Sequence, residues 1–79
     1  MLTFFETIKL PFKPRLNDTI ENRRGQRFKC IGFGKKVIDN DYQDYYTYRQ
    51  FNTDQVPVQF EIIPEKYCEA MENKLIFKI

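Results

Sequence analysis

The stretch Gly25 to Lys36, GQRFKCIGFGKK, decides the fold of this chain of 79 residues. Large apolar residues alternate with polar ones after the turn glycine, and this period of two predicts a β-strand over residues 27–38. Gly32 and Gly34 inside the strand indicate a bulge or a sharp bend, which is how small barrels turn their corners. The predicted faces of the strand are Phe28, Cys30 and Gly32 on one side, and Ile31 and Phe33 on the other. This strand is expected at the centre of a small sheet.

The chain before this strand predicts a further strand and a connection. Residues 2–12 alternate with period two, and Pro11 places the end of that strand at a sheet edge, because proline donates no ladder hydrogen bond. Asp18, with Glu21 three residues later, matches a capping box. Residues 17–25 are therefore expected as one helical turn or a tight irregular loop.

The chain after the central strand predicts the remaining elements. Residues 39–44, DNDYQD, are expected as a polar loop before a return strand over residues 45–51. Residues 56–62 alternate cleanly and predict another strand. A proline at the first helical position predicts a short helix over about residues 64–72. Residues 74–79 alternate again and are expected as the closing strand.

These elements predict a mainly β domain of about five strands, with one short helix before the last strand. A small SH3-like barrel or a strongly bent antiparallel sheet fits this order best, and an OB-like barrel is the alternative. Residues 1–79 are expected to form a single domain with one core, because the chain is near the lower size limit for a stable core. The predicted core residues are Phe4, Ile8, Leu10, Phe28, Cys30, Val58, Phe60, Ile62, Met71, Leu75 and Phe77.

Two segments, RGQRFKCIG at residues 24–32 and YTYRQF at residues 46–51, carry a family pattern. The region over about residues 24–52 resembles a family of small uncharacterised bacterial SH3-like domains, which read Gly-x-x-(Tyr/Phe)-x-Val-x-Gly, then a loop, then Val-Val-Tyr-Arg-x-Leu-Tyr. The matching positions here are Gly25, Phe28, Ile31 or Cys30, Gly32, Tyr48, Arg49 and Phe51. The resemblance implies an SH3-like fold. The family's His-Ser-Glu-Thr-like loop motif is replaced here, so a function residing in that loop does not carry over.

The charge distribution and the cysteine content indicate which partners and which compartment to expect. The net charge is +2, but residues 1–36 carry nine Lys/Arg against three Asp/Glu, and residues 37–79 carry four against eight. This asymmetry indicates an anionic partner for the first half, unless the two halves pair and their charges cancel in space. Cys30 and Cys68 lie in apolar contexts and are expected as buried thiols of a cytoplasmic protein. Without a leader or about 18 consecutive apolar residues, no membrane association is predicted.

The residue inventory removes most catalytic chemistry. The chain contains no His and no Ser, which excludes Ser–His and Cys–His nucleophilic sites and any metal site built on histidine. The run from Asp39 fails the EF-hand pattern, because Asp44 stands where glycine is needed and Gln50 where glutamate is needed. No catalytic residue, metal site or cofactor is therefore predicted, and the chain is expected not to be an enzyme.

The acidic half supports the first of two binding hypotheses. The candidates for contact with a protein are Asp39, Asp41, Tyr42, Asp44 and Tyr45. Carboxylates with tyrosine anchors suit a basic site on a protein, because rigid rings add contact area at low entropy cost. Small size and the lack of catalytic residues fit a phage or mobile-element protein that binds and blocks a host protein, such as an inhibitor that antagonises host defence. A homo-oligomer is compatible with this hypothesis.

The alternative hypothesis is nucleic-acid binding by an SH3- or OB-like domain through its cationic N-terminal half. The candidates are Arg23, Arg24, Arg27, Lys29, Phe33, Lys35 and Lys36. Cations that follow the phosphates and rings that stack on unpaired bases suit a single strand. The same Lys and Arg residues also suit the solubility and edge protection of a strand.

Overall fold

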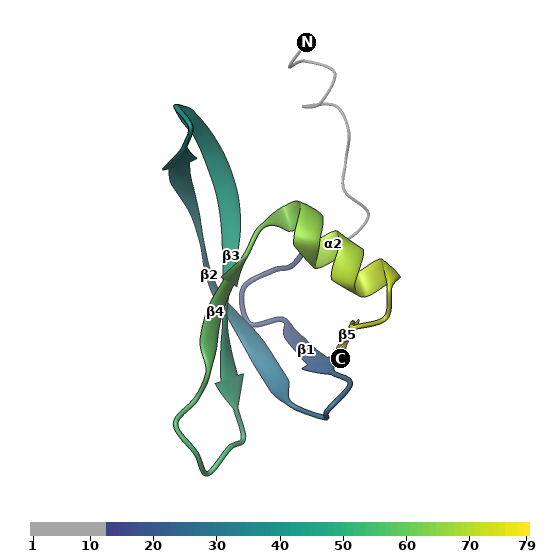
Figure 1. The fold of residues 1–79 in the computed structure, drawn as a ribbon. Coiled ribbons are helices and arrows are strands. Elements are labelled where there is room, and N and C mark those ends of the chain that lie inside the picture. Colours follow the sequence, from purple (N-terminus) through teal and green to yellow (C-terminus); the bar gives the residue numbers. More distant parts are fainter. Residues whose placement is uncertain (1–12) are drawn as a thin grey trace.

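A computed structural model of the chain describes residues 13–79, and within them an open antiparallel sheet carries one helix (Figure 1). The elements are β1 (Thr19–Asn22), β2 (Arg27–Ile38), β3 (Asp41–Phe51), β4 (Gln59–Ile62), α2 (Pro64–Glu72) and β5 (Ile76–Lys78). The strand order is β4-β3-β2-β1-β5, and every neighbouring pair is antiparallel. The mainly β fold with a short helix before the last strand is confirmed. Among residues 13–79 the sheet does not close into a barrel, so the bent open sheet is the form observed.

The strand expected over residues 2–12, together with its core residues Phe4, Ile8 and Leu10, lies outside the described residues. Helix α2, the helix among residues 13–79, is not long and apolar enough to cross a membrane.

The central strand is confirmed, and so is its bulge, but the bulge changes the predicted faces. Cys30 pairs with Tyr48, whereas Gly32 pairs with Thr47, so the register shifts between them. Because directly opposite residues share a face, the chain beyond the extra residue changes sides. Phe33 therefore lies opposite Tyr46, with ring centroids 5.6 Å apart, on the face of Cys30. The predicted placement of Phe33 and Gly32 on the other faces was wrong, because simple alternation does not survive a bulge.

The polar run after β2 is mostly strand rather than the expected loop. Ile38 pairs with Asp41, which leaves a turn of two residues. Asp39 and Asn40 have φ angles of 52° and 63°, as a type I′ hairpin turn requires, and Asp and Asn tolerate this left-handed region. The turn therefore needs only these two residues, and β3 begins four residues earlier than predicted.

The helical turn or irregular loop expected over residues 17–25 is instead β1 followed by a tight turn. Ile20 is almost fully buried opposite Phe28, which holds this segment in the sheet. The Asp18 carboxylate accepts a hydrogen bond from the Arg15 N–H, so it does not cap a helix. Gly25 takes a φ of 79° in the turn, where a side chain is disfavoured. Burial of one isoleucine has therefore overridden a capping pattern.

The core lies between the inner face of the sheet and α2, and tyrosine dominates it (Figure 1). Among residues 13–79, the buried hydrophobic residues of the core are Ile20, Phe28, Cys30, Tyr46, Tyr48, Tyr67 and Cys68. Phe28 and Cys30 are confirmed as core, and the predicted Phe60, Ile62 and Met71 pack partly buried against them. Cys30 and Cys68 are both buried as thiols. The helix turns Tyr67 and Cys68 inward, as its sequence predicts.

Three predicted core residues are exposed: Val58, Leu75 and Phe77. The phase of the closing strand explains two of these errors. Helix α2 ends at Glu72 with Asn73 as its C-cap, and Lys74 takes a φ of 57°, so β5 begins at Ile76 with that side chain inward. Its neighbours Leu75 and Phe77 therefore point to the outer face.

Candidate functional site

The outer halves of β2 and β3 project from the body of the sheet as a two-stranded arm (Figure 1). Strand β1 pairs with β2 only as far as Lys29, and β4 pairs with β3 only from Tyr46 onward. Residues 34–45, which we call the arm, pair across the hairpin from Gly34 and Tyr45 to the turn. Among residues 13–79, no other strand flanks the arm on either side.

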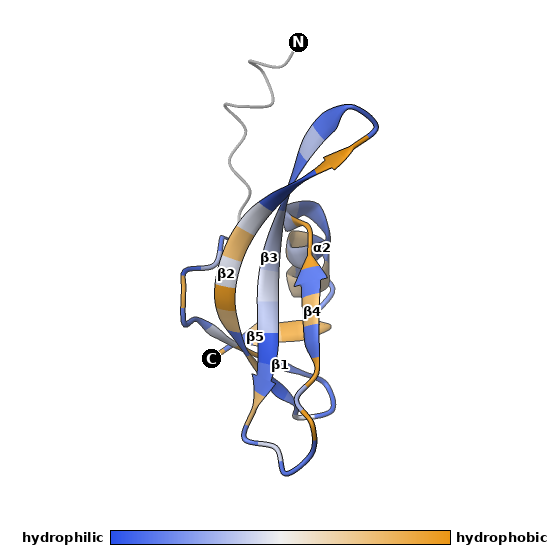
Figure 2. Ribbon diagram, turned by 90° about the vertical axis from the view of Figure 1, so that its left-hand side faces the viewer, coloured by the Kyte–Doolittle hydropathy of each residue, from blue (hydrophilic) through white to orange (hydrophobic). Residues whose placement is uncertain are grey.

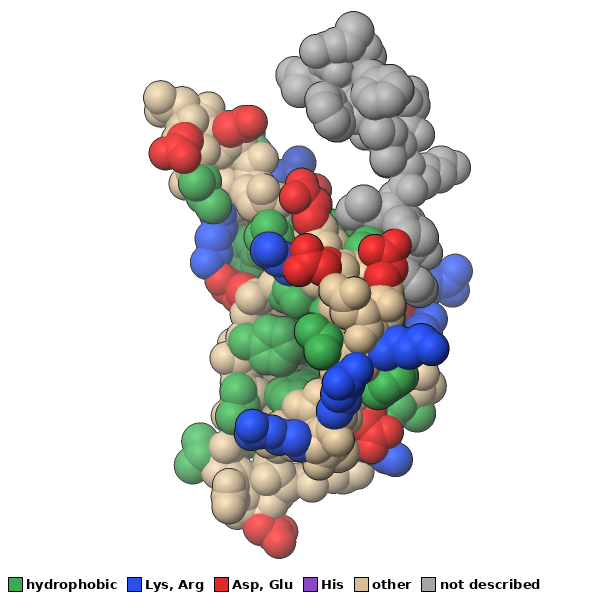
Figure 3. Space-filling model, turned by 45° about the vertical axis from the view of Figure 1, so that its right-hand side comes forward, with side chains coloured by type: hydrophobic (Ala, Val, Ile, Leu, Met, Phe, Trp, Pro, Cys, Tyr) green, Lys and Arg blue, Asp and Glu red, His purple; other side chains and the backbone are tan. Residues whose placement is uncertain are grey.

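The arm collects the whole acidic candidate set. Asp39 lies in the turn, and the other four follow in β3: Asp41, Tyr42, Asp44 and Tyr45. Tyr42 is 74% exposed, and Figure 3 shows acidic side chains at the tip of the arm. Tyr42 and Asp44 share the face of Tyr46, whereas Asp41 and Tyr45 lie on the opposite face. The predicted residues are therefore neighbours, but they are divided between two faces.

Two apolar residues of the arm tip were missed by the sequence reasoning. Val37 is 66% exposed directly opposite Tyr42, and Ile38 is 51% exposed beside the turn. In Figure 2 the end of β2 is hydrophobic and the turn after it is hydrophilic. The Asp-Asn dipeptide was the signal that could have found them, because a two-residue turn places both residues at the end of a hairpin.

The cations of the arm are paired with carboxylates. Lys35 lies 4.0 Å from Asp44 on the neighbouring strand, and Lys36 forms an ion pair with Glu61 of β4. The hydrogen bond to Glu61 raises the pKa of Lys36. Lys36 also lies 5.1 Å from the centre of the Tyr45 ring. These two predicted nucleic-acid contacts are therefore neutralised at the base of the arm.

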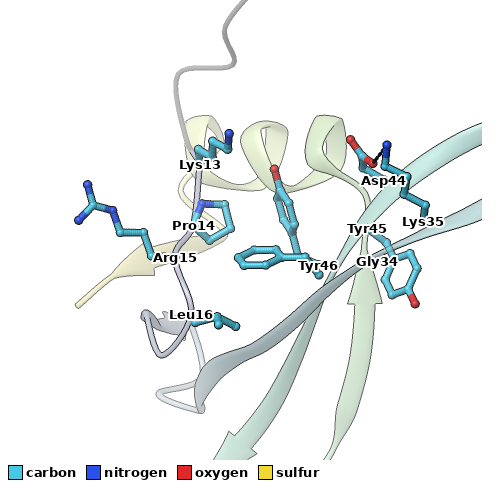
Figure 4. Close-up of a pocket in the computed structure, with 10 residues that line it drawn as sticks. Lys13, Pro14, Arg15, Leu16, Gly34, Lys35, Asp44, Tyr45 and Tyr46 are labelled. Carbon is cyan, nitrogen blue, oxygen red and sulfur yellow. Dashed lines mark ion pairs between the residues drawn. The ribbon is translucent and has the colours of Figure 1, made fainter.

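A hollow of about 660 Å³ opens at the base of the arm, on the face that carries Tyr46 (Figure 4). The residues that line it are Lys13, Pro14, Arg15, Leu16, Phe33, Gly34, Lys35, Asp44, Tyr45 and Tyr46. Figure 4 shows the Tyr46 ring pointing toward α2, where it meets Tyr67, while the Tyr45 ring points away to the other side of the strands. The volume of the hollow is in the range that accommodates a bulky side chain or a small ligand.

The remaining cationic candidates do not gather on one face. Arg23 donates hydrogen bonds to the carbonyl oxygens of Lys74 and Asn73 at 2.9 and 3.4 Å, so its guanidinium is held at the C-terminal end of α2. Arg27 lies 4.0 Å from Glu21, and Arg24 lies in the exposed turn.

Lys29 lies on the outer face of the sheet, with its ammonium 5.5 Å from the centre of the Phe51 ring. Arg49, which the sequence reasoning missed, lies directly opposite it. Phe33 lies on the inner face, away from this pair. Lys29 of the predicted set therefore has a second cation, Arg49, directly opposite it on the outer face.

In the part of the chain that is described, the site presents carboxylates, cations and aromatic rings. Among residues 13–79, no three His, Cys, Asp or Glu side chains gather in a way that could hold a metal ion. Comparison of the chain with models of protein families, with curated proteins and with solved structures found no match.

Proposed function

We propose that this chain is a non-enzymatic binding protein whose arm binds, and thereby blocks, a partner protein at a basic site. One observation carries the proposal. A projecting two-stranded arm exposes apolar side chains, Val37, Ile38 and Tyr42, among the carboxylates of Asp39 and Asp41. In the setting that the size and composition suggest, the chain is encoded by a phage or mobile element and the partner is a host protein.

The physical basis is an apolar anchor with a charged surround. Tyrosine is enriched among residues that dominate interface energies, and Tyr42 stands free of the core with Val37 beside it. The surrounding carboxylates steer a basic partner and disfavour an acidic one. The arm is also preorganised, because both strands are paired up to a type I′ turn, so little backbone entropy is lost on binding.

The hollow at the base of the arm extends the proposed surface. Tyr42 and Asp44 share a face with Tyr46, which lines the hollow. A partner that packs along this face contacts Tyr42 near the tip and places an apolar side chain against Tyr46. Contact along the arm and in the hollow would bury more surface than contact with the tip alone.

The test compares an arm variant with a matched variant of the β3–β4 loop. The doubly substituted Asp41→Asn/Tyr42→Ser protein loses one charge and one exposed apolar side chain, as does Asp54→Asn/Val56→Ser, where Val56 is also highly exposed. Proteins captured by the wild type from host-cell extract are quantified with each variant. We expect capture to fall about tenfold or more with the arm variant and to be unchanged with the loop variant. Equal capture by both variants contradicts the proposal.

Nucleic-acid binding is the second candidate, supported by the position of Lys29 directly opposite Arg49 on the outer face. Neither forms an ion pair with an acid among residues 13–79, and the Phe51 ring lies beside Lys29. Such a site would bind a single strand through phosphates and one stacked base.

Fluorescence anisotropy with labelled single- and double-stranded oligonucleotides at two salt concentrations tests this candidate. Binding that weakens steeply with salt, and whose salt dependence flattens in Lys29→Ala/Arg49→Ala by about one contact per residue, would place nucleic acid first. Absence of binding at low salt would exclude it.

A further inference from the structure

The free edge of β5 carries an exposed apolar stripe. Phe77 lies on the outer face of β5, and Leu75 and Ile79 flank the strand; the three side chains Leu75, Phe77 and Ile79 are 49%, 44% and 57% exposed. Strand β5 is one end of the sheet among residues 13–79, and its other edge pairs with β1. An exposed apolar edge strand is a template for pairing with another strand.

The backbone groups of β5 alternate between β1 and the free side. The Ile79 N–H donates to the Thr19 carbonyl oxygen at 2.9 Å. Hydrogen-bonded pairs occur at every second position of an antiparallel ladder, so Phe77 also bonds to β1. The N–H and C=O groups of Ile76 and Lys78 therefore point to the free side, where β5 has no neighbouring strand among the described residues.

We infer that β5 pairs with β5 of a second copy of this chain, antiparallel about a two-fold axis at Phe77. In this register Ile76 faces Lys78 of the second copy, and the reverse pair also forms, so the four outward-pointing groups of each copy are matched. Phe77 meets its own equivalent in a non-hydrogen-bonded pair, where side chains approach most closely. Leu75 faces Ile79 of the second copy, which makes the apolar stripe continuous.

Two features of the β5 edge are compatible with a neighbouring strand at this edge. A hollow of about 580 Å³ borders the strand, and its lining includes the consecutive residues Ile76, Phe77 and Lys78. Because consecutive side chains of a strand point to opposite faces, a hollow that touches all three lies along the strand edge. The Lys78 ammonium is 3.5 Å from the Asp18 carboxylate of its own chain, so its charge is compensated.

The opposite edge of the sheet, at β4, is protected against the same pairing. Pro57 and Pro64 flank β4 closely, and each lacks a backbone N–H. Glu61 also adds a charge to this short strand, which is a common means of protecting an edge. The contrast between the two edges singles out β5 as the self-association surface.

Sedimentation equilibrium and amide hydrogen exchange at protein concentrations from about 10 μM to about 1 mM test the inference. This range is needed because two paired strands of three residues form a small and therefore weak interface. We expect a monomer–dimer equilibrium in which the Ile76 and Lys78 amides become protected as the dimer forms. The Phe77 amide is expected to be protected at every concentration. A monomer at all concentrations overturns the inference. Protection of the Ile76 and Lys78 amides that does not depend on protein concentration also overturns it, because the β5 edge would then be paired within one chain.

Two matched pairs of variants locate the contact. Phe77→Lys places two like charges together on the axis and should weaken dimerisation about tenfold or more, whereas Val56→Lys in the β3–β4 loop should leave it unchanged. Lys78→Pro removes an outward N–H, and Lys78→Ala keeps it while removing the same side chain. Thermal melts of the monomers confirm folding. Equal dimerisation of Lys78→Pro and Lys78→Ala overturns the proposed register.

Discussion

Three buried tyrosines make the core of this protein unusual in its protonation chemistry. Tyr48 stacks on Tyr67 with ring centroids 5.9 Å apart, and Tyr46 meets Tyr67 edge-on at 5.5 Å. Burial raises the pKa of the hydroxyl in each of the three. Burial also raises the pKa of the Cys30 thiol. All four groups are therefore held in their neutral forms by the fold.

These shifts predict that stability falls at alkaline pH. The unfolded chain releases the Cys30 proton near pH 9.0 and the tyrosine protons near pH 10.0, whereas the folded chain keeps them. Above those values the unfolded state binds fewer protons, so the free energy of unfolding decreases as pH rises, by up to about 1.4 kcal/mol per pH unit and group. Urea midpoints should be constant from about pH 7 to about 8.5 and then fall. A constant midpoint up to about pH 11 would contradict these assignments.

Lys74 supports a second prediction at the scale of one residue. The Lys74 N–H donates to Met71 and the Leu75 N–H to Ala70, as in a Schellman motif, and Lys74 takes the left-handed position at φ 57°. Lys74→Gly should therefore raise the free energy of unfolding by about 0.5–1 kcal/mol, measured by urea denaturation. Lys74→Ala is the control, because it removes the same charge but keeps the Cβ. If the alanine variant is equally stable, strain at this position is absent.

Among the elements, the arm depends on a glycine that lies under an aromatic ring. A Cβ at Gly34 would collide with the ring of Tyr45, its partner across the hairpin, whereas a Cβ at Gly32 meets no atom within 4 Å. Gly34→Ala should therefore displace the Tyr45 ring and destabilise the protein by about 1 kcal/mol or more. Gly32→Ala should be neutral or slightly stabilising, because it reduces backbone entropy loss in a strand. Denaturation of the two variants, with chemical shifts of Tyr45, distinguishes them; equal effects would contradict the packing described.

Strand β4 provides a test of the core at the scale of an element. The Phe60 ring lies 5.2 Å from Phe28 and 5.8 Å from Tyr48, whereas Val58, two residues earlier, is exposed. Phe60→Ala should cost about 3 kcal/mol of unfolding free energy, and Val58→Ala should cost less than about 0.5 kcal/mol. A near-neutral Phe60→Ala would mean that β4 presents its other face to the core.

Over the whole molecule, local signals in the sequence predicted which elements form, and long-range packing decided how their faces are arranged. Alternation predicted β2, and Pro64 predicted the start of α2. The inward phase of β5 could not be predicted, because it depends on the left-handed residue at Lys74 that precedes it. The capping pattern at Asp18 was misleading, since Ile20 is buried by strands that come later in the chain.

The candidate site was predictable in its residues and not in its shape. The five acidic and tyrosine candidates all lie within residues 39–45, so any hairpin would keep them close. That they form a projecting arm follows from where β1 and β4 stop pairing, which is set by the lengths of other strands. The neutralisation of Lys35 and Lys36 could not be predicted, because their ion pairs form across the hairpin and with a strand further along the chain.

Site-specific photocrosslinking in cells that produce the protein tests the arm most directly. A photoreactive phenylalanine analogue replaces Tyr42 in one protein and Val56 in another, since both side chains are highly exposed. We expect a discrete protein adduct from position 42 that is absent from position 56. We also expect weaker adduct formation when Asp41 is changed to Asn. Adducts of equal yield from both positions, or an adduct with nucleic acid alone, would contradict the assignment of the arm as the protein-binding surface.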